Sequence, residues 1–296
     1  MDIQWYPGHM TKARRQMEED LKLVDLIIEL VDARIPFSSR NPDIRGMGVS
    51  KGRLIILNKA DLADENLNRL WLDAYREQGA QVLLADSRSK ASLRQVQPLV
   101  QEACREKIER DRRKGIKNRP VRAMVCGIPN VGKSTFINSI AGRASAKTGN
   151  RPGVTRGRQW IRLNKSLELL DTPGILWPRF DDPQAGERLA MIGSVNDTIL
   201  NTEELALRLI AFLTEEYPEA LPERYGISAE PEEAEPGTDE PALSREAELL
   251  RRIAVSRNCI LRGGDLDWAK AAGILLDDFR GGKLGRITLE APQKTL

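Results

Sequence analysis

The residues best suited to chemistry in this sequence form a loop from Gly127 to Ser134, GIPNVGKS. They match the phosphate-binding pattern G-x-x-x-x-G-K-S, and they follow an apolar run and precede a helical one, as that pattern requires. The glycines let backbone N–H groups face phosphates, the Lys133 ammonium neutralises phosphate charge, and the Ser134 hydroxyl can bind magnesium. We expect nucleotide contacts from these loop residues: Asn130, Val131, Gly132, Lys133, Ser134 and Thr135.

Two further segments offer groups for a metal ion and for a terminal phosphate. DTPG, at 171–174, ends a strand-like run, so Asp171 would lie beside magnesium, acting through water, and the Gly174 N–H would face a γ-phosphate. Between this segment and the phosphate loop, RPGVTRG offers the Thr155 hydroxyl, which can close over the metal when the γ-phosphate is present. We therefore expect Ser134, Thr155 and Asp171 to hold Mg²⁺.

The segment NKAD, from Asn58 to Asp61, indicates which base the site reads. A carboxylate at Asp61 accepts hydrogen bonds from N1–H and the exocyclic amine of guanine, whereas adenine has neither donor there and would leave a buried charge unpaired. Lys59 would lie along the base, and Asn58 would tie this segment to the phosphate loop. Asp86 and Ser87, which follow the run VLLA, are suited to a third loop on the base side. Together these motifs predict binding of GTP and GDP.

The order of these motifs along the chain is unusual. In the Ras-like arrangement the phosphate loop comes first, but here NKAD precedes it. The chain therefore resembles a circularly permuted GTPase. A permutation moves the chain ends while it keeps the same site in space.

The elements that must position the motifs follow from the hydrophobic pattern. Compact apolar runs alternate with amphipathic stretches such as ENLNRLWLDAYREQG, which predicts a parallel sheet flanked by helices. The predicted buried strands lie within 23–34, 53–62, 81–87 and 122–130. WIRLN and SLELLDTPG predict an edge hairpin at 160–174. The fold class is thus α/β, a permuted Ras-like GTPase domain with a smaller helical domain after it.

The later part of the chain reads as helical. TEELALRLIAFLTEEY, 202–217, has helical spacing, with Thr202 expected as its N-terminal cap. Two more helical patterns follow, and glycines 281 and 282 predict the end of the last helix. We place an N-terminal segment at 1–20, the GTPase domain at 21–178 and the helical domain at 179–296, with an acidic linker at about 229–242.

Composition restricts the class of protein. The 296 residues are 30% charged and 41% hydrophobic, as in a soluble protein, and no apolar run approaches a membrane span or the core of a secretory signal. We expect a cytoplasmic protein without a membrane partner. Its three cysteines are far apart and it has one histidine, which disfavours structural zinc or a disulfide framework. The net charge of +3 is small, but residues 105–122 hold nine basic and three acidic side chains.

Seven segments together resemble one bacterial family, ribosome biogenesis GTPase A, also called YlqF. They are WYPGHMTKARR, DARIP, NKADL, GIPNVGKS, NRPGVTRGRQW, DTPGILWP and the terminal RGGDLDWAKAAGILLDDFRGGKLGRITLE. The resemblance spans nearly the whole chain and departs most at the acidic linker. It implies a GTPase that acts late in assembly of the large ribosomal subunit, with a helical domain that helps contact ribosomal RNA.

The resemblance also bears on catalysis. Ras-like enzymes orient the attacking water with a glutamine after D-x-x-G, whereas this chain has Ile175 there. A lone histidine such as His9 can simply pack or cap a turn, but it lies in WYPGHM, which resembles the family motif whose histidine is implicated in catalysis. Asn130 resembles the asparagine of potassium-activated GTPases, whose side-chain oxygen helps hold K⁺. We thus expect His9 to be catalytic and K⁺ to be a second cofactor.

Several partners and functions follow as expectations. Lys12, Arg14, Arg15 and the basic stretch at 105–122 are suited to phosphate-backbone contacts with ribosomal RNA. The leading function is an assembly factor that is activated on the large subunit and released after GTP hydrolysis, and that is monomeric when free. The alternative is a nucleotide-gated RNA-binding module whose hydrolysis is incidental. Ile175, in place of the glutamine that orients water, is consistent with this alternative. A GTPase of transfer-RNA modification or stress signalling is a third, less favoured function.

Overall fold

The structure is a computed structural model of the whole chain. It describes residues 9–46, 51–116, 119–142, 159–172, 174, 176, 182–195, 201–228 and 243–292.

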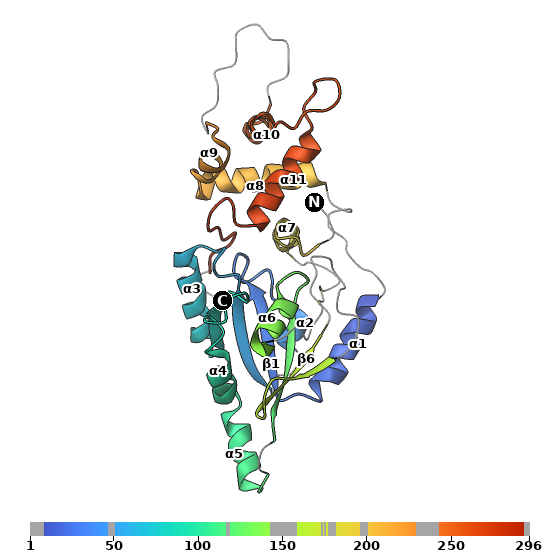
Figure 1. The fold of residues 1–296 in the computed structure, drawn as a ribbon, viewed down its shortest axis with the longest axis vertical. Helices are drawn as coiled ribbons and strands as arrows, with labels where there is room; N and C mark the ends of the chain where they lie inside the picture. Colours follow the sequence, from blue (N-terminus) through green and yellow to red (C-terminus); the bar gives the residue numbers. More distant parts are fainter. Residues whose placement is uncertain are drawn as a thin grey trace.

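Six strands form one sheet in the order β3-β2-β1-β4-β6-β5 (Figure 1). They are β1 (Leu26–Asp32), β2 (Gly52–Asn58), β3 (Gln81–Ala85), β4 (Val121–Gly127), β5 (Gln159–Arg162) and β6 (Leu167–Asp171). All pairs are parallel except β5–β6, which is the predicted hairpin at one edge. The central strand β1 is buried along its whole length, as expected for a strand with helices on both faces. The predicted α/β class is therefore confirmed.

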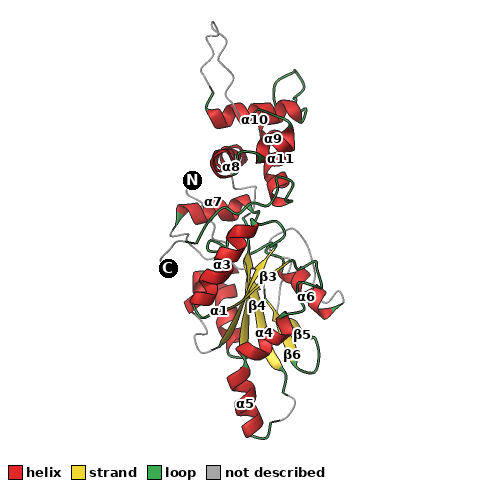
Figure 2. Ribbon diagram, turned by 90° about the vertical axis from the view of Figure 1, so that its left-hand side faces the viewer, coloured by secondary structure: helices red, strands yellow, loops and turns green. Residues whose placement is uncertain are grey.

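Helices cover both faces of the sheet (Figure 2). The helices α1 (His9–Leu21) and α3 (Glu65–Glu77) lie on one face, and α4 (Val96–Ala103) and α6 (Lys133–Ala141) lie on the other. Met17 and Leu21 of α1 pack against Ile27 and Met124 of the sheet. The short α2 (Pro42–Gly46) follows β1, and α5 (Arg105–Arg113) extends away from the sheet at the end of the molecule opposite the helical domain.

A helical domain follows the sheet, as the sequence predicts. It comprises α7 (Pro183–Met191), α8 (Thr202–Glu216), α9 (Ala220–Tyr225), α10 (Arg245–Ser256) and α11 (Trp268–Arg280). In Figure 1, α7 lies between the sheet and the other four helices. Within the described residues, no helix has both the length and the apolar character needed to cross a membrane.

The N-terminal cap of α8 differs from the prediction. Asn201, rather than Thr202, precedes the helix, and its side chain accepts a hydrogen bond from the Glu204 N–H at 3.1 Å. Asn201 has an extended backbone, which directs its oxygen toward the free N–H groups of the first turn. Thr202 already has a helical conformation and so is the first residue of the helix.

The C-terminal tail returns to the α/β domain, which the hydrophobic pattern did not predict. The Ile287 N–H donates to the Leu62 carbonyl at 3.0 Å, and the Leu289 N–H donates to the Arg34 carbonyl at 2.8 Å. The indole N–H of Trp71 in α3 donates to the Glu290 carbonyl at 2.9 Å. The tail therefore fastens the helical domain to the loops that follow β1 and β2.

Glu290 is the buried anchor of this tail. Its carboxylate accepts hydrogen bonds from the N–H groups of Phe37 and Ser38, from the Ser38 hydroxyl at 2.6 Å, and from Arg188 of α7 at 3.1 Å. Burial raises the pKa of Glu290, although these donors and the Arg188 charge oppose the shift. One side chain thus joins the tail, the loop after β1 and the helical domain.

Replacing this carboxylate is expected to destabilise the protein. Glu290→Ala leaves the N–H groups of Phe37 and Ser38 without this acceptor and removes the ion pair with Arg188, so the free energy of unfolding should fall by about 3 kcal/mol in urea denaturation. The control Asp73→Ala removes an exposed carboxylate 3.7 Å from Arg76 and should cost about 0.5 kcal/mol or less. Equal effects of the two substitutions would contradict the anchoring role of Glu290.

Candidate functional site

The sequence motifs meet at the carboxyl-terminal ends of the strands because these strands are parallel. Asp32 at the end of β1 is level with Asn58 at the end of β2, and Gly127 at the end of β4 pairs with Leu30 of β1. Asp171 ends β6 and pairs with Val125 of β4. The NKAD, GIPNVGKS and DTPG segments therefore all leave the sheet on the same side, where ligands of open α/β sheets bind.

Close packing explains the glycines of the phosphate loop. Gly127 has φ +152°, and a Cβ atom there would lie 2.5 Å from the Leu30 carbonyl oxygen. Gly132 caps α6 with φ +101°, and a Cβ there would lie 2.5 Å from Nδ2 of Asn58. Any larger residue would thus push the loop away from β1 or from NKAD.

Lys133 is folded into the phosphate loop. Its ammonium donates to the carbonyl oxygens of Gly127 at 3.0 Å and Ile128 at 2.8 Å. Burial lowers the pKa of Lys133 to about 8, although the charge of Asp171 opposes the shift. A Cβ at Gly174 would lie only 2.8 Å from Nζ of Lys133, so the DTPG glycine packs directly against this loop. An anion here would gain a preformed positive site.

The groups expected to hold magnesium have the right chemistry. Asp171 is buried at the end of β6, and the neighbouring Thr172 hydroxyl donates to the Val125 carbonyl at 2.7 Å, which fixes the strand end. Ser134 lies in the first turn of α6. Among the described residues, no group of three or more His, Cys, Asp or Glu side chains is placed so that it could hold a metal ion. A magnesium ion that takes most of its ligands from phosphates and water fits one carboxylate and one hydroxyl.

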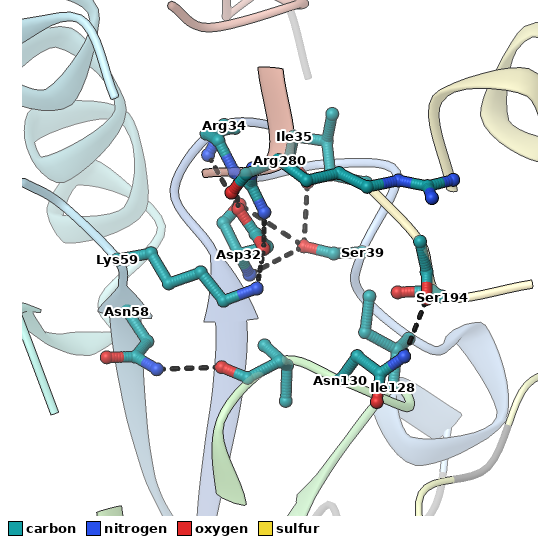
Figure 3. Close-up of polar contacts among 12 residues, drawn as sticks. Asp32, Arg34, Ile35, Ser39, Asn58, Lys59, Ile128, Asn130, Ser194 and Arg280 are labelled. Carbon is teal, nitrogen blue, oxygen red and sulfur yellow. Dashed lines mark hydrogen bonds and ion pairs between the residues drawn. The ribbon is translucent and has the colours of Figure 1, made fainter. Parts of the chain in front are cut away.

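Asn58 joins three loops through one amide group. Its Nδ2 donates to the Val131 carbonyl of the phosphate loop at 2.7 Å, as Figure 3 shows. Its Oδ1 accepts from the N–H and the hydroxyl of Ser87 at 2.9 and 2.7 Å. The link from NKAD to the phosphate loop that the sequence predicts is present, and Ser87 is held by the same side chain.

Asp61 has a buried oxygen that is available to a ligand. Its Oδ1 has no hydrogen-bond partner in the structure, whereas its Oδ2 accepts from Arg88. Arg88 also donates to Asp86 through its own N–H and its Nε, at 2.9 and 3.0 Å. Because a buried acceptor without a donor is costly, Asp61 is suited to a ligand that brings N–H donors.

Lys59 lies against a carboxylate that the sequence did not single out. It has φ +58°, and its Nζ lies 2.9 Å from Oδ2 of the fully buried Asp32. Burial opposes ionisation of Asp32, but the charges of Arg34 and Lys59 outweigh it and hold the pKa of Asp32 well below its usual range. Burial lowers the pKa of Lys59. An acid at the end of a fully buried strand is the sequence signal that points to Asp32.

Part of the predicted site lies outside the described residues. Thr155 and Ile175 are not described, and the structure describes the backbone of His9, at the start of α1, but not its side chain. The roles predicted for them therefore stay predictions.

Comparisons with known proteins give matches along the whole chain. Residues 122–233 match the family model "50S ribosome-binding GTPase". Ribosome biogenesis GTPase A of Priestia megaterium (strain DSM 319 / IMG 1521) is 47% identical over 99% of this chain and 98% of its own length. Mitochondrial ribosome-associated GTPase 1 of Xenopus tropicalis is 33% identical over 97% of this chain and 94% of its own. A solved structure of GDP-bound YlqF has a TM-score of 0.65 at 25% identity, covering 94% of this chain and 99% of that one.

The buried Lys133 predicts a pH dependence of stability without bound nucleotide. Between about pH 8 and pH 10.5 the folded protein loses the Lys133 proton while the unfolded chain keeps it, so the free energy of unfolding should rise with pH. Across this pH range the deprotonation of Lys133 should raise the free energy of unfolding by about 3 kcal/mol in total. Urea denaturation at several pH values should therefore show a steeper rise for the unsubstituted protein than for Lys133→Met. Parallel profiles would contradict a depressed pKa at this site.

Proposed function

Because the chain belongs to the ribosome biogenesis GTPase A family and is a GTP-hydrolysing enzyme, we propose that it serves assembly of the large ribosomal subunit. The subunit activates hydrolysis, and hydrolysis releases the protein. The relatives named for ribosome biogenesis and the match to a ribosome-binding GTPase model support this role. Ribosomal RNA is then the surface on which the protein acts.

The observation that carries the proposal is the convergence of three motif loops on Asn58. The phosphate loop, through its backbone N–H groups and Lys133, would hold the phosphates of GTP. The Asp61 carboxylate, whose Oδ1 atom lacks a partner, would accept from the guanine N1–H and amine, and Lys59 would lie along the base. Asp86 and Ser87 would border the base from the third loop.

The metal ions have separate places in this proposal. Mg²⁺ would be held by Ser134 and Thr155, and by Asp171 through water, and it would neutralise charge on the phosphates. Asn130 uses its amide nitrogen to donate to the Gly193 carbonyl at 2.6 Å, so its side-chain oxygen is the atom left for K⁺. A monovalent cation there would add positive charge at the phosphates.

Hydrolysis needs a group that orients water, and His9 is our candidate. Ile175 cannot do so, because its side chain is a hydrocarbon. An imidazole has a donor and an acceptor nitrogen and titrates near neutral pH, so it can position the attacking water. α1 begins at His9 and packs on the sheet through Met17 and Leu21. The backbone at His9 therefore belongs to a helix that is held against the GTPase domain, which supports a role for His9 near this domain.

The sheet order supports a circular permutation. β2 leads into NKAD and precedes β4, which leads into the phosphate loop, yet both strands lie beside β1 and are parallel to it. The guanine and phosphate loops are thus neighbours in space although their order along the chain is reversed relative to Ras-like enzymes. The permutation also lets DTPG lead directly toward α7 and the helical domain.

The basic helix α5 is a candidate RNA contact. It extends from the sheet into solvent (Figure 1), and it has four exposed arginines, Arg105, Arg110, Arg112 and Arg113. Arg15 on α1 is also exposed. Such side chains bind RNA phosphates without reading sequence, and their contribution falls as salt rises. The alternative function, a nucleotide-gated RNA-binding module with incidental hydrolysis, would use the same surface.

Turnover on the ribosome separates these two functions. We expect purified large subunits to stimulate GTP hydrolysis in potassium buffer, and His9→Ala to lower the stimulated rate by about a hundredfold because the water is no longer oriented. Phosphate release is the measurement, with GDP affinity determined in parallel to separate lost catalysis from lost binding. Stimulated turnover that His9→Ala leaves unchanged would remove His9 from the mechanism. Absence of stimulation with GTP binding intact would favour the binding module.

Base recognition by Asp61 is tested by exchanging donors and acceptors. Asp61→Asn presents an amide N–H where guanine also donates, so GDP affinity should fall by about a thousandfold, whereas xanthosine diphosphate, with a carbonyl in place of the amine, should bind better. Calorimetry with both nucleotides measures this change. Asp73→Asn on the exposed face of α3 is the control. An unaltered preference in Asp61→Asn would exclude Asp61 from the base site.

A further inference from the structure

We propose that Arg34 and Arg280 are positioning residues for guanine nucleotide binding, through which the helical domain holds the NKAD loop. The inference rests on the proposed function, because it takes NKAD as the guanine site. We call the contacts of Asp32, Arg34 and Arg280 the latch.

The latch begins at Lys59, whose conformation needs support. A lysine with φ +58° occupies the left-handed region, which costs free energy for a residue with a Cβ. Its ammonium is held by Oδ2 of Asp32 at 2.9 Å. The same carboxylate accepts from the Arg34 guanidinium through Nε and Nη2, both at 2.9 Å. The place of Lys59 therefore depends on a carboxylate that it shares with Arg34.

Arg34 connects this carboxylate to the helical domain. It is only 1% exposed, and its Nη1 donates to the backbone carbonyl of Arg280 at 3.2 Å. Its guanidinium carbon also lies 5.5 Å from the centre of the Phe279 ring, within the range of a cation–π interaction. Both partners belong to the last turn of α11, so the end of that helix covers Arg34 and sets its position.

Arg280 extends the connection to α7 with its side chain. Its Nε donates to the Met191 carbonyl at 3.0 Å and its Nη2 to the Ala190 carbonyl at 2.9 Å. These carbonyls belong to the last turn of α7, and the Ala190 carbonyl also accepts from the Gly193 N–H at 3.0 Å, so the guanidinium adds donors at the end of this helix. A Cβ at Gly193, which has φ +77°, would lie 3.1 Å from Nε of Arg280, so the turn after α7 closes directly on this guanidinium.

The same turn contacts the phosphate loop. The Gly193 carbonyl accepts from Nδ2 of Asn130 at 2.6 Å, and the Ser194 hydroxyl donates to the Pro129 carbonyl at 2.8 Å. Figure 3 shows Asp32, Lys59 and Arg34 on one side of this arrangement and Asn130 and Ser194 on the other, with Arg280 between them. The helical domain is therefore bonded to both loops that would hold the nucleotide.

This arrangement predicts a coupling that does not depend on the γ-phosphate. The contacts reach NKAD and the first residues of the phosphate loop. GDP and GTP would both contact these segments, because both nucleotides have the guanine base and the α- and β-phosphates. Loss of the latch should thus weaken both nucleotides by the same factor. Because coupling is reciprocal, bound GDP should in turn protect the ends of α7 and α11 from opening.

The experiment compares variants of the full chain by fluorescence titration with labelled GDP and a nonhydrolysable GTP analogue. Arg34→Lys keeps a positive charge for Asp32, but a single ammonium cannot also reach the Arg280 carbonyl. Arg280→Ala removes the fork that holds α7. The control Arg224→Ala breaks a 2.8 Å ion pair with Asp278, also on α11, and leaves the latch intact.

We expect each latch variant to weaken both nucleotides about tenfold and the control to change neither appreciably. The double variant Arg34→Lys/Arg280→Ala should bind no more weakly than the worse single variant, because both act on one connection; a general loss of stability would give additive effects. Unchanged affinity in a folded Arg34→Lys protein would overturn the inference. So would additive losses.

A measurement on the unsubstituted protein guards against variants that fail to fold. Amide hydrogen exchange at residues 189–195 and 277–282 should slow when GDP is added. Unchanged exchange in GDP-saturated protein would also overturn the latch. Failure of the unsubstituted protein to bind GDP would instead overturn the guanine site itself, so the two failures are distinguishable.

Discussion

The parallel alignment of β1, β2, β4 and β6 is the constraint on which the rest of the structure depends. Parallel strands all end at the same edge, so Asp32, Asn58, Gly127 and Asp171 come together although the chain separates them widely. The segments that leave these strands then have no room for side chains at some positions. Glycine at 127 and 132 is the consequence, because a Cβ at either one would meet β1 or Asn58 within 2.5 Å.

Buried polar groups join the loops at this edge. Asn58, Asp32 and Lys133 are each almost entirely buried. Asn58 and Asp32 each bond to residues of two segments, whereas Lys133 donates to two carbonyls of the phosphate loop itself. A buried charge or amide without a partner costs several kcal/mol, so moving one loop away would leave groups on the others unpaired. This cost favours a single arrangement of the loops. Burial lowers the pKa of Lys133 because the nearby charge of Asp171 offsets only part of the cost of burying the ammonium.

The helical domain takes part in this arrangement. Its last helix covers Arg34, its first helix ends against the phosphate loop, and its tail runs along the loops after β1 and β2. Glu290 holds the tail in place, because its carboxylate accepts hydrogen bonds from Ser38 in the loop after β1 and from Arg188 of α7. A domain held at so many buried polar contacts cannot move without disturbing the phosphate loop and the loops after β1 and β2.

The sequence by itself determined the motifs, the fold class and most elements. A phosphate loop is readable because its chemistry lies in contiguous residues, and the buried strands are readable because helices on both faces demand continuous apolar runs. The N-terminal cap of α8 was misassigned by one residue, since Asn201 and Thr202 are both good caps and only the backbone conformation separates them. Tertiary structure alone decided that Asp32 holds Lys59, that Arg34 reaches Arg280 and that Glu290 binds Ser38. The two residues of each pair are far apart along the chain, and no local sequence pattern links them. Only the packing of the strands, helices and tail brings these buried polar groups together.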